Sequence, residues 1–142
     1  MLSTPSQCDN GRIEPIRSAA MAQAPTLPDG LVVVVKEECA TCRMVVPVIA
    51  QLVGQSPMTV YVQDDPTFLG EIPAVMDDDL ALSWHHEIET VPTLIKVRDG
   101  EEVDRTVGWA RAEWERVSGT PDLGNDLPAF RPGCGSAASR RC

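Results

Sequence analysis

The spacing of apolar residues divides the first half of the chain into a strand, a helix and a second strand. Residues 31–35 (LVVVV) form a continuous β-branched run, which is typical of a central strand covered on both faces. Across residues 42–53 apolar side chains recur at helical spacing, which predicts a helix that stops at Gly54. Residues 58–62 (MTVYV) predict another strand. Because the three segments together span about thirty residues, we expect a right-handed crossover and a parallel pair of strands.

The second half of the chain predicts a hairpin between two helices. Two β-type runs, residues 93–97 and 103–107, flank an Asp-Gly dipeptide at 99–100, which is a strong signal for an antiparallel hairpin. Residues 80–88 before the hairpin and 109–117 after it carry helical spacing. The predicted order is therefore strand, helix, strand, helix, hairpin, helix, with a mixed sheet between the helices.

Two features concern the ends of the predicted helices. Pro47 lies in the first helix, and a proline inside a helix costs about 3 kcal/mol and kinks it. We expect either a bend at this proline or a helix that ends at Val46. The acidic run at 77–79 is interpreted as the solvated first turn of the second helix, where carboxylates are stabilising.

Composition fits one compact domain with a tail at each end. The chain has 142 residues, of which 43% are hydrophobic, and it contains neither a membrane-length apolar run nor an internal repeat. We expect a domain at residues 30–118 and a disordered tail at residues 1–29. Residues 119–142 predict an irregular tail, rich in Gly, Pro and Ser, that can dock across the domain.

Charge and the N-terminal sequence narrow the range of partners. A net charge of −9 repels phosphate backbones and anionic lipids, so neither nucleic acid nor a membrane surface is expected as a partner. Residues 1–30 contain no apolar segment of the length that a secretory signal needs. We therefore expect a cytoplasmic protein.

Two of the five cysteines lie in patterned sequence. Cys39 and Cys42 form a C-x-x-C pair at the start of the first helix, whereas Cys8, Cys134 and Cys142 lie toward the chain ends. An odd count with this distribution does not indicate a disulfide framework. Unpaired N–H groups and the dipole at a helix start favour a thiolate. A second thiol nearby can resolve the mixed disulfide that such a thiolate forms.

Two longer stretches carry a resemblance to a known family. Residues 39–52 (CATCRMVVPVIAQL) resemble the active-site helix of thioredoxins, in which C-x-x-C is followed by a basic residue, a Met, two apolar residues and a proline. Residues 90–102 (TVPTLIKVRDGEE) resemble the second thioredoxin signature, a cis-proline followed by Thr and a strand that runs into a turn. The resemblance covers about residues 30–118. It implies an α/β, thioredoxin-like fold with a mixed sheet of about four strands flanked by helices.

The resemblance also implies a thiol-disulfide oxidoreductase that acts on protein disulfides. Cys39, exposed at the helix start, would be the nucleophile, and the more buried Cys42 would be the resolving thiol. Val91, Pro92 and Thr93 would hold an extended substrate opposite the thiols, with a cis bond before Pro92. Neither an organic cofactor nor a metal is implied. Electrons would come from a separate reductase or from small thiols.

Two positions depart from the family's pattern. Glu38, preceded by Glu37, stands where the family usually has a tryptophan, and carboxylates there oppose ionisation of Cys39. Arg43 would offset them in part. Val33 stands where thioredoxins place a buried carboxylate that helps to take the proton of the resolving thiol, and the sequence leaves the replacement base open. A slower or more specialised reductant is expected.

Alternatives remain at three other positions. Cys134, flanked by glycines in RPGCGS, is either a third redox thiol that the tail brings to Cys39 or a free thiol in a disordered tail. His85 and His86 would complete a zinc site with the C-x-x-C thiols, although neighbouring side chains on a helix point in different directions.

Two rival functions on the same fold are a carrier of persulfide or a soft metal, and a binding module switched by its disulfide.

Overall fold

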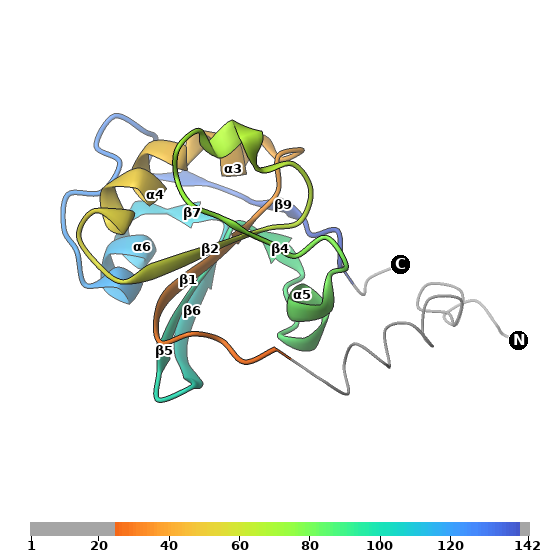
Figure 1. The fold of residues 1–142 in the computed structure, drawn as a ribbon. Coiled ribbons are helices and arrows are strands. Elements are labelled where there is room, and N and C mark those ends of the chain that lie inside the picture. Colours follow the sequence, from red (N-terminus) through yellow and green to blue (C-terminus); the bar gives the residue numbers. More distant parts are fainter. Residues whose placement is uncertain (1–24, 140–142) are drawn as a thin grey trace, which may run out of the picture.

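The computed structural model describes residues 25–139, which fold around a mixed sheet of five strands (Figure 1). The strands, in the order β3-β2-β1-β5-β6 across the sheet, are β1 (Gly30–Val35), β2 (Met58–Val62), β3 (Val75–Met76), β5 (Thr93–Arg98) and β6 (Glu101–Val107). β1 is parallel to β2 and β2 to β3, whereas β5 is antiparallel to both β1 and β6. The predicted parallel pair and hairpin are confirmed. The strand beyond the expected four is β3, whose two exposed residues are too few to form a pattern.

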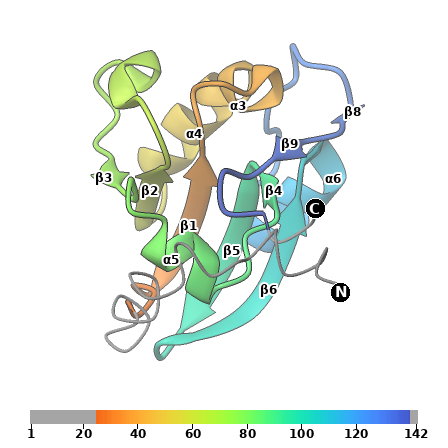
Figure 2. The same cartoon turned by 90° about the vertical axis from the view of Figure 1, so that its right-hand side faces the viewer.

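Helices cover both faces of this sheet. They are α3 (Ala40–Met44), α4 (Val46–Val53), α5 (Ala81–His85) and α6 (Arg111–Ser118), with a short 3-10 helix, η1 (Pro66–Leu69). Figure 2 shows α5 in front of the sheet and α4 and α6 behind it. A mixed sheet between helices is the α/β architecture expected from the resemblance.

β1 is the centre of the hydrophobic core. Residues 32–35 are each 0% exposed, because β2 and β5 pair with the two edges of β1 and helices cover its faces. This explains why the strand is apolar at every position rather than at alternate ones. The loop of residues 36–38 therefore leaves the carboxyl end of a buried strand and leads directly into α3.

The helix that carries the two thiols is broken at Val45. α3 ends at Met44, Val45 has a ψ of 4°, and α4 begins at Val46 with Pro47 in its first turn. A proline is tolerated there because the first N–H groups of a helix have no partner within the helix. The expected bend is thus a break between two helices, which separates the turn of the thiols from the longer helix.

The acidic run before α5 acts at the start of that helix, but it is not fully solvated. Asp77 is 4% exposed, and its carboxylate accepts hydrogen bonds from the N–H groups of Leu82 and Ser83, both at 3.0 Å. Asp79 accepts a hydrogen bond from the N–H of Ala81 at 3.1 Å. The interpretation as a solvated turn is therefore wrong for Asp77, because its carboxylate replaces water as the acceptor for the first N–H groups of the helix.

Two pairs of short strands hold the C-terminal segment on the domain. The antiparallel pairs are β4 (Thr90–Val91) with β9 (Cys134–Gly135), and β7 (Trp109–Ala110) with β8 (Phe130–Arg131). Residues 119–139 are thus docked, but they are not irregular throughout, because backbone pairing with distant segments creates β8 and β9. We call residues 130–139 the C-terminal strap.

At the other end of the described chain, residues before β1 also contact the domain. Leu27 is 4% exposed, and the carboxylate of Asp29 accepts a hydrogen bond from the N–H of Gly100 at 2.8 Å. The rest of the predicted N-terminal tail, with Cys8, lies outside the described residues, as does Cys142. Within residues 25–139 there is no helix whose length and apolar character would let it cross a membrane.

Candidate active site

The C-x-x-C thiols lie at the start of α3, just beyond the carboxyl end of β1. Cys39 is the N-cap residue of α3, with extended backbone (φ −155°), and its Sγ accepts a hydrogen bond from the N–H of Cys42 at 3.2 Å. Cys42 lies one turn further and is 0% exposed. The start of α3 thus places the N–H of Cys42 against the Cys39 sulfur and buries the thiol of Cys42.

The loop before β5 faces Cys39. The Val91–Pro92 peptide bond is cis, and Cys39 Sγ lies 3.6 Å from the carbonyl oxygen of Val91. Thr93 is 0% exposed, and its hydroxyl donates a hydrogen bond to the carbonyl of Thr90 at 2.5 Å. This hydrogen bond stabilises the conformation of the loop. Of the three predicted substrate-binding residues, Val91 is the one whose backbone contacts the thiol.

Cys39 is buried, and the expectation of an exposed nucleophile is wrong for this structure. Its exposed fraction is 2%. The C-terminal strap is responsible, because β9 pairs with β4 so that Cys134 lies opposite Val91. In addition, the hydroxyl of Thr41 donates a hydrogen bond to the carbonyl of Pro132 at 2.7 Å, which ties the strap to α3.

Three thiols meet at the site, and their environments separate their acidities. A hydrogen bond from the thiol of Cys42, followed by one from Cys134 and by backbone N–H groups, lowers the pKa of Cys39 to about 5 against the opposing effect of burial. Burial first, and then the bond to the Cys39 sulfur, raises the pKa of Cys42 far above its usual range. Burial and the same sulfur also raise the pKa of Cys134. Of the three thiols, Cys39 is therefore the one whose surroundings favour the thiolate most.

The loop of residues 36–38 is ordered by a carboxylate that the sequence did not single out. Asp64 accepts hydrogen bonds from the N–H groups of Glu37 at 2.6 Å and Glu38 at 3.2 Å. A signal was present, because Asp64 follows β2 and the carboxyl ends of parallel strands meet at one edge of a sheet. Asp64 thus positions the chain directly in front of Cys39.

The two residues predicted to tune Cys39 lie on different elements, Glu38 in the loop before the thiol and Arg43 in α3. Arg43 Nη1 donates a hydrogen bond to the carbonyl of Glu37 at 2.6 Å and lies 4.0 Å from the carboxylate of the same residue. Arg43 therefore acts on Glu37, and this solvent-exposed pair is worth little in free energy. Glu38 is exposed beside the thiol turn.

Around Cys42, the position of the family's buried carboxylate is filled by an apolar side chain. Val33 is 0% exposed and belongs to the hydrophobic core. The N–H of Lys36 donates a hydrogen bond to Cys42 Sγ at 3.5 Å. The backbone of the loop thus provides a polar contact to the resolving sulfur, while position 33 provides none.

The histidines do not join the thiols. His86 Nε2 lies 2.9 Å from the carbonyl oxygen of Pro25, and its ring packs edge-on against His85 with centroids 4.7 Å apart. Within residues 25–139, no three His, Cys, Asp or Glu side chains are grouped so that they could hold a metal ion. The zinc arrangement considered from the sequence is therefore not formed.

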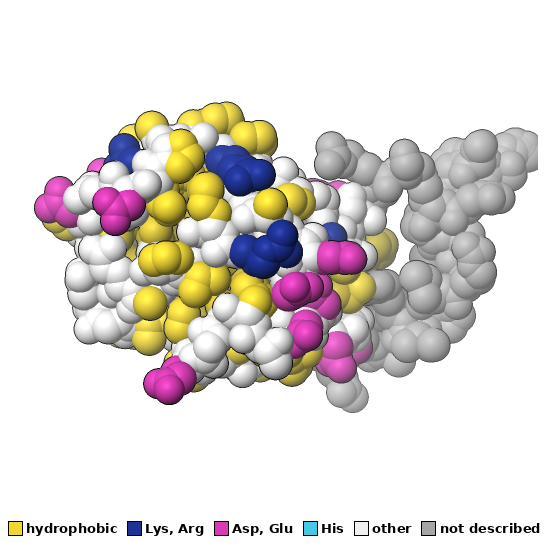
Figure 3. Space-filling model, turned by 90° about the horizontal axis from the view of Figure 1, so that it is seen from above, with side chains coloured by type: hydrophobic (Ala, Val, Ile, Leu, Met, Phe, Trp, Pro, Cys, Tyr) yellow, Lys and Arg dark blue, Asp and Glu magenta, His cyan; other side chains and the backbone are white. Residues whose placement is uncertain are grey.

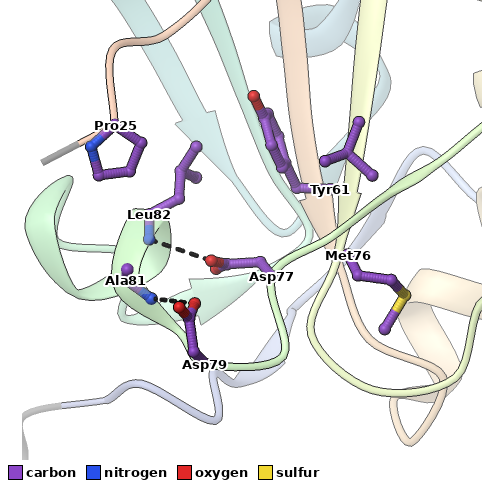
Figure 4. A pocket seen from close by; sticks show the side chains of 8 residues that line it. Pro25, Tyr61, Met76, Asp77, Asp79, Ala81 and Leu82 are labelled. Atoms are coloured by element: carbon purple, nitrogen blue, oxygen red, sulfur yellow. Dashed lines mark hydrogen bonds between the residues drawn. The ribbon is translucent and has the colours of Figure 1, made fainter. Parts of the chain in front are cut away.

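A separate hollow lies between the sheet and α5 (Figure 4). It measures about 430 Å³, and its walls include Tyr61, Met76, Asp77 and Leu82. The carboxylate of Asp77 turns to the N–H of Leu82 rather than into the hollow, and none of the three thiols lines it. The thiol cluster is thus the candidate active site. On the face seen from above, apolar side chains are spread across the middle, with Lys and Arg side chains among them (Figure 3).

Comparison with known proteins finds thioredoxins. The chain is 27% identical over 79 residues to Thioredoxin H-type 1 of Nicotiana tabacum, which covers 56% of this chain and 55% of that protein. It is 30% identical over 82 residues to Thioredoxin H2-1 of Oryza sativa subsp. japonica, which covers 58% of this chain and 52% of that protein. With Thioredoxin of Chlamydia pneumoniae it shares 32% identity over 84 residues, 58% of this chain and 72% of the relative. The chain thus spans about half the length of the two plant relatives. No family model and no solved structure matches it.

Proposed function

The chain belongs to the thioredoxin family, and from this premise we propose that it is a thiol-disulfide oxidoreductase that reduces protein disulfides through Cys39 and Cys42. One observation carries the proposal. Cys39 Sγ, which accepts a hydrogen bond from the N–H of Cys42 at the start of α3, lies 3.6 Å from the carbonyl oxygen of Val91 in the cis-proline loop, and a buried second thiol lies one turn away. The names of the relatives do not favour the persulfide or soft-metal carrier.

The proposed reaction is a dithiol exchange in two displacements. The thiolate of Cys39 attacks one sulfur of a substrate disulfide, that disulfide breaks, and the first substrate sulfur leaves as a thiolate. Cys42 then gives up its proton and attacks Cys39 Sγ, so the mixed disulfide breaks and the second substrate sulfur leaves. Two electrons pass to the substrate, and the proton of Cys42 passes to one of the two substrate sulfurs. The departing substrate sulfur can serve as the base that Val33 does not supply.

The substrate proposed for this site is an extended segment of a protein with a disulfide. Such a segment would pair with the backbone of Val91 as an added strand. Because Pro92 has no backbone N–H, it offers no donor that would compete with this pairing. The Cys39–Cys42 disulfide would be reduced again by a separate reductase or by small thiols, with no organic cofactor. We propose that this cycle runs in the cytoplasm, where the compartment keeps dithiols reduced.

The experiment that tests the proposal is a redox titration of the Cys39–Cys42 pair in glutathione or dithiothreitol buffers, made in Cys134→Ser so that only this pair lies in the site. A discrete two-electron equilibrium near about −270 mV, the thioredoxin value, supports a reductant, whereas a value above about −200 mV indicates an oxidant or isomerase. Cys39→Ser is the control and should show no such equilibrium. If Cys134→Ser shows none either, the oxidoreductase proposal fails.

A further inference from the structure

The edge that a substrate would use is already paired in this molecule. β9 of the C-terminal strap runs antiparallel to β4, with Cys134 opposite Val91 and Gly135 opposite Thr90. Both views in Figures 1 and 2 show β9 beside β4 below the start of α3. The strap therefore occupies the added-strand position that the proposed function assigns to a protein substrate.

The strap is seated by specific contacts on both sides of Cys134. After it, buried Gln63 donates a hydrogen bond to Ser136 Oγ at 2.7 Å and accepts one from the N–H of Ala137 at 2.9 Å. The N–H of Ser136 also donates to the carbonyl of Glu89 at 3.0 Å. Before it, β8 pairs with β7, and Pro132 accepts a hydrogen bond from Thr41. Contacts from four parts of the domain thus hold the strap in one register.

Gly133 allows the close approach. A Cβ at this position would lie 2.4 Å from the carbonyl oxygen of Val91 and 2.7 Å from Thr90 Cγ2, closer than real side chains come. At Gly135, two residues further, a Cβ would meet nothing within 4 Å. Only the first of these glycines is required for the strap to reach the loop, and it immediately precedes the cysteine.

The thiol of Cys134 lies where the cysteine of a substrate would lie. It is opposite Val91, the residue whose carbonyl oxygen is 3.6 Å from Cys39 Sγ, and the two thiols are near enough that each shifts the pKa of the other. A cysteine on an extended strand beside the nucleophile has the chemistry of a disulfide partner rather than that of an incidental thiol.

We propose that the C-terminal strap is a resident substrate of this site and that Cys134 is a third redox thiol, which exchanges disulfides with Cys39. The inference rests on the proposed function of Cys39 as nucleophile. In the oxidised protein, the Cys134 thiolate attacks Cys39 Sγ; the Cys39–Cys134 bond forms, the Cys39–Cys42 bond breaks, and Cys42 takes up the proton that Cys134 released. No electrons are gained or lost, because the disulfide moves from one pair of sulfurs to another.

A consequence for external substrates follows from the same contacts. A protein disulfide reaches Cys39 only when the strap has left the edge at β4, so the strap competes with every substrate at a high effective concentration. Alternatively, electrons leave the site through Cys134 while the strap stays near the loop. In both cases the strap, rather than the C-x-x-C pair alone, decides which disulfides react.

The decisive experiment removes the competing thiol Cys42. Full-length Cys42→Ser, with Cys8 and Cys142 also changed to Ser, is treated with oxidised glutathione, and its disulfides are mapped by mass spectrometry after non-reducing digestion. We expect glutathione to add to Cys39 and then to be expelled by Cys134, which leaves an internal Cys39–Cys134 disulfide. The matched control carries the same three changes together with Cys134→Ser, and it should keep glutathione on Cys39.

The outcomes separate this inference from the proposed function. Persistent glutathione on Cys39 in both proteins overturns the role of Cys134 and leaves Cys39 as a nucleophile. No adduct at Cys39 in either protein overturns the nucleophile itself, and the inference falls with it. A Cys39–Cys134 disulfide in the first protein alone supports both.

A second measurement tests the seating of the strap without changing a thiol. Gly133→Ala should speed exchange of Cys39 with oxidised glutathione by about tenfold, the change that corresponds to a loss of about 1.4 kcal/mol in docking. Gly135→Ala, the matched control, should leave the rate unchanged. Ser136→Ala, which removes a hydrogen bond from Gln63, provides a milder variant and should change the rate in the same direction. Equal rates for all of these and the wild type would overturn the resident strand.

Discussion

At the scale of the residue, Cys39 lies between two other thiols and one backbone carbonyl. Its sulfur accepts a hydrogen bond from the backbone N–H of Cys42 and lies 3.6 Å from the carbonyl oxygen of Val91, and the nearby thiols of Cys42 and Cys134 lower its pKa. Neither flanking glutamate is needed for this, because the donors approach from the helix and the strap. The acidity of Cys39 is therefore set by its neighbours in space more than by Glu37 and Glu38.

We expect the thiolate of Cys39 to persist in the folded, reduced protein down to about pH 5. Hydrogen bonds lower the pKa of Cys39 to about 5, whereas an unperturbed thiol titrates near about 8.5. This thiolate thus stabilises the fold fully above about pH 8.5, and the contribution is lost as the pH falls through about 5. Ultraviolet absorption during acid titration should show a step near this value that Cys39→Ser lacks. Loss of all thiolate absorption by about pH 7 would contradict the expectation.

Asp64 provides a second test at this scale. Asp64→Ala should slow exchange of Cys39 with small disulfides and lower the free energy of unfolding by about 1 kcal/mol, because two N–H groups of the thiol loop lose their acceptor. Asp65→Ala is the matched control, since Asp65 accepts hydrogen bonds from Thr67 at the start of η1. Stopped-flow exchange rates and urea unfolding measure the two effects. Equal exchange rates in the two variants would sink the role assigned to Asp64.

At the scale of the element, long patterns were predicted and short strands were not. β1 and β2 were found because an uninterrupted apolar run has few other structures open to it, and the hairpin because Asp99-Gly100 fits a tight turn. β3 and β9 each contain two residues. So short a strand carries no period, and it exists only because a partner from elsewhere in the chain pairs with it.

The hairpin turn gives a prediction at this scale. Gly100 has a φ of +78°, and a Cβ added there would meet nothing within 4 Å, so Gly100→Ala should lower the free energy of unfolding by about 1 kcal/mol through backbone strain alone. Gly54→Ala is the control, because Gly54 has helical backbone (φ −76°) with contacts no closer than 3.7 Å. Urea unfolding should find the second variant unchanged or slightly more stable. A loss of equal size in both would show that strain at the turn is not the cause.

At the scale of the whole molecule, the candidate site joins segments far apart in the sequence. The two cysteines and the cis-proline loop were predictable because family motifs mark them. The docked tail with Cys134 at Cys39 was one of two alternatives, and the sequence could not choose it, because the docking depends on Thr41 meeting Pro132 across 91 positions and on Gln63 meeting Ser136 across 73. Gln63 directly follows β2, and nothing in the sequence around a single polar residue at the end of a strand indicates that its hydrogen-bond partner is Ser136.

Net charge leads to a prediction for the molecule as a whole. With a net charge of −9, the protein should react faster with an anionic disulfide as salt increases and more slowly with a cationic one, because salt screens repulsion and attraction alike. Oxidised glutathione and cystamine are a suitable pair, compared between about 0.01 and about 0.15 M ionic strength. Parallel salt dependences for the two would indicate that charge does not steer the encounter.

The path of the C-terminal segment past Trp109 has an optical consequence. Trp109 is 0% exposed, packs against Trp114 with ring centroids 5.3 Å apart, and donates its indole N–H to the carbonyl of Pro128 at 2.7 Å. Departure of β8 would break the pairing of Trp109 with Arg131 and admit water to the ring. The emission of tryptophan should then shift to longer wavelength, so that opening of the site can be followed by fluorescence without an added label.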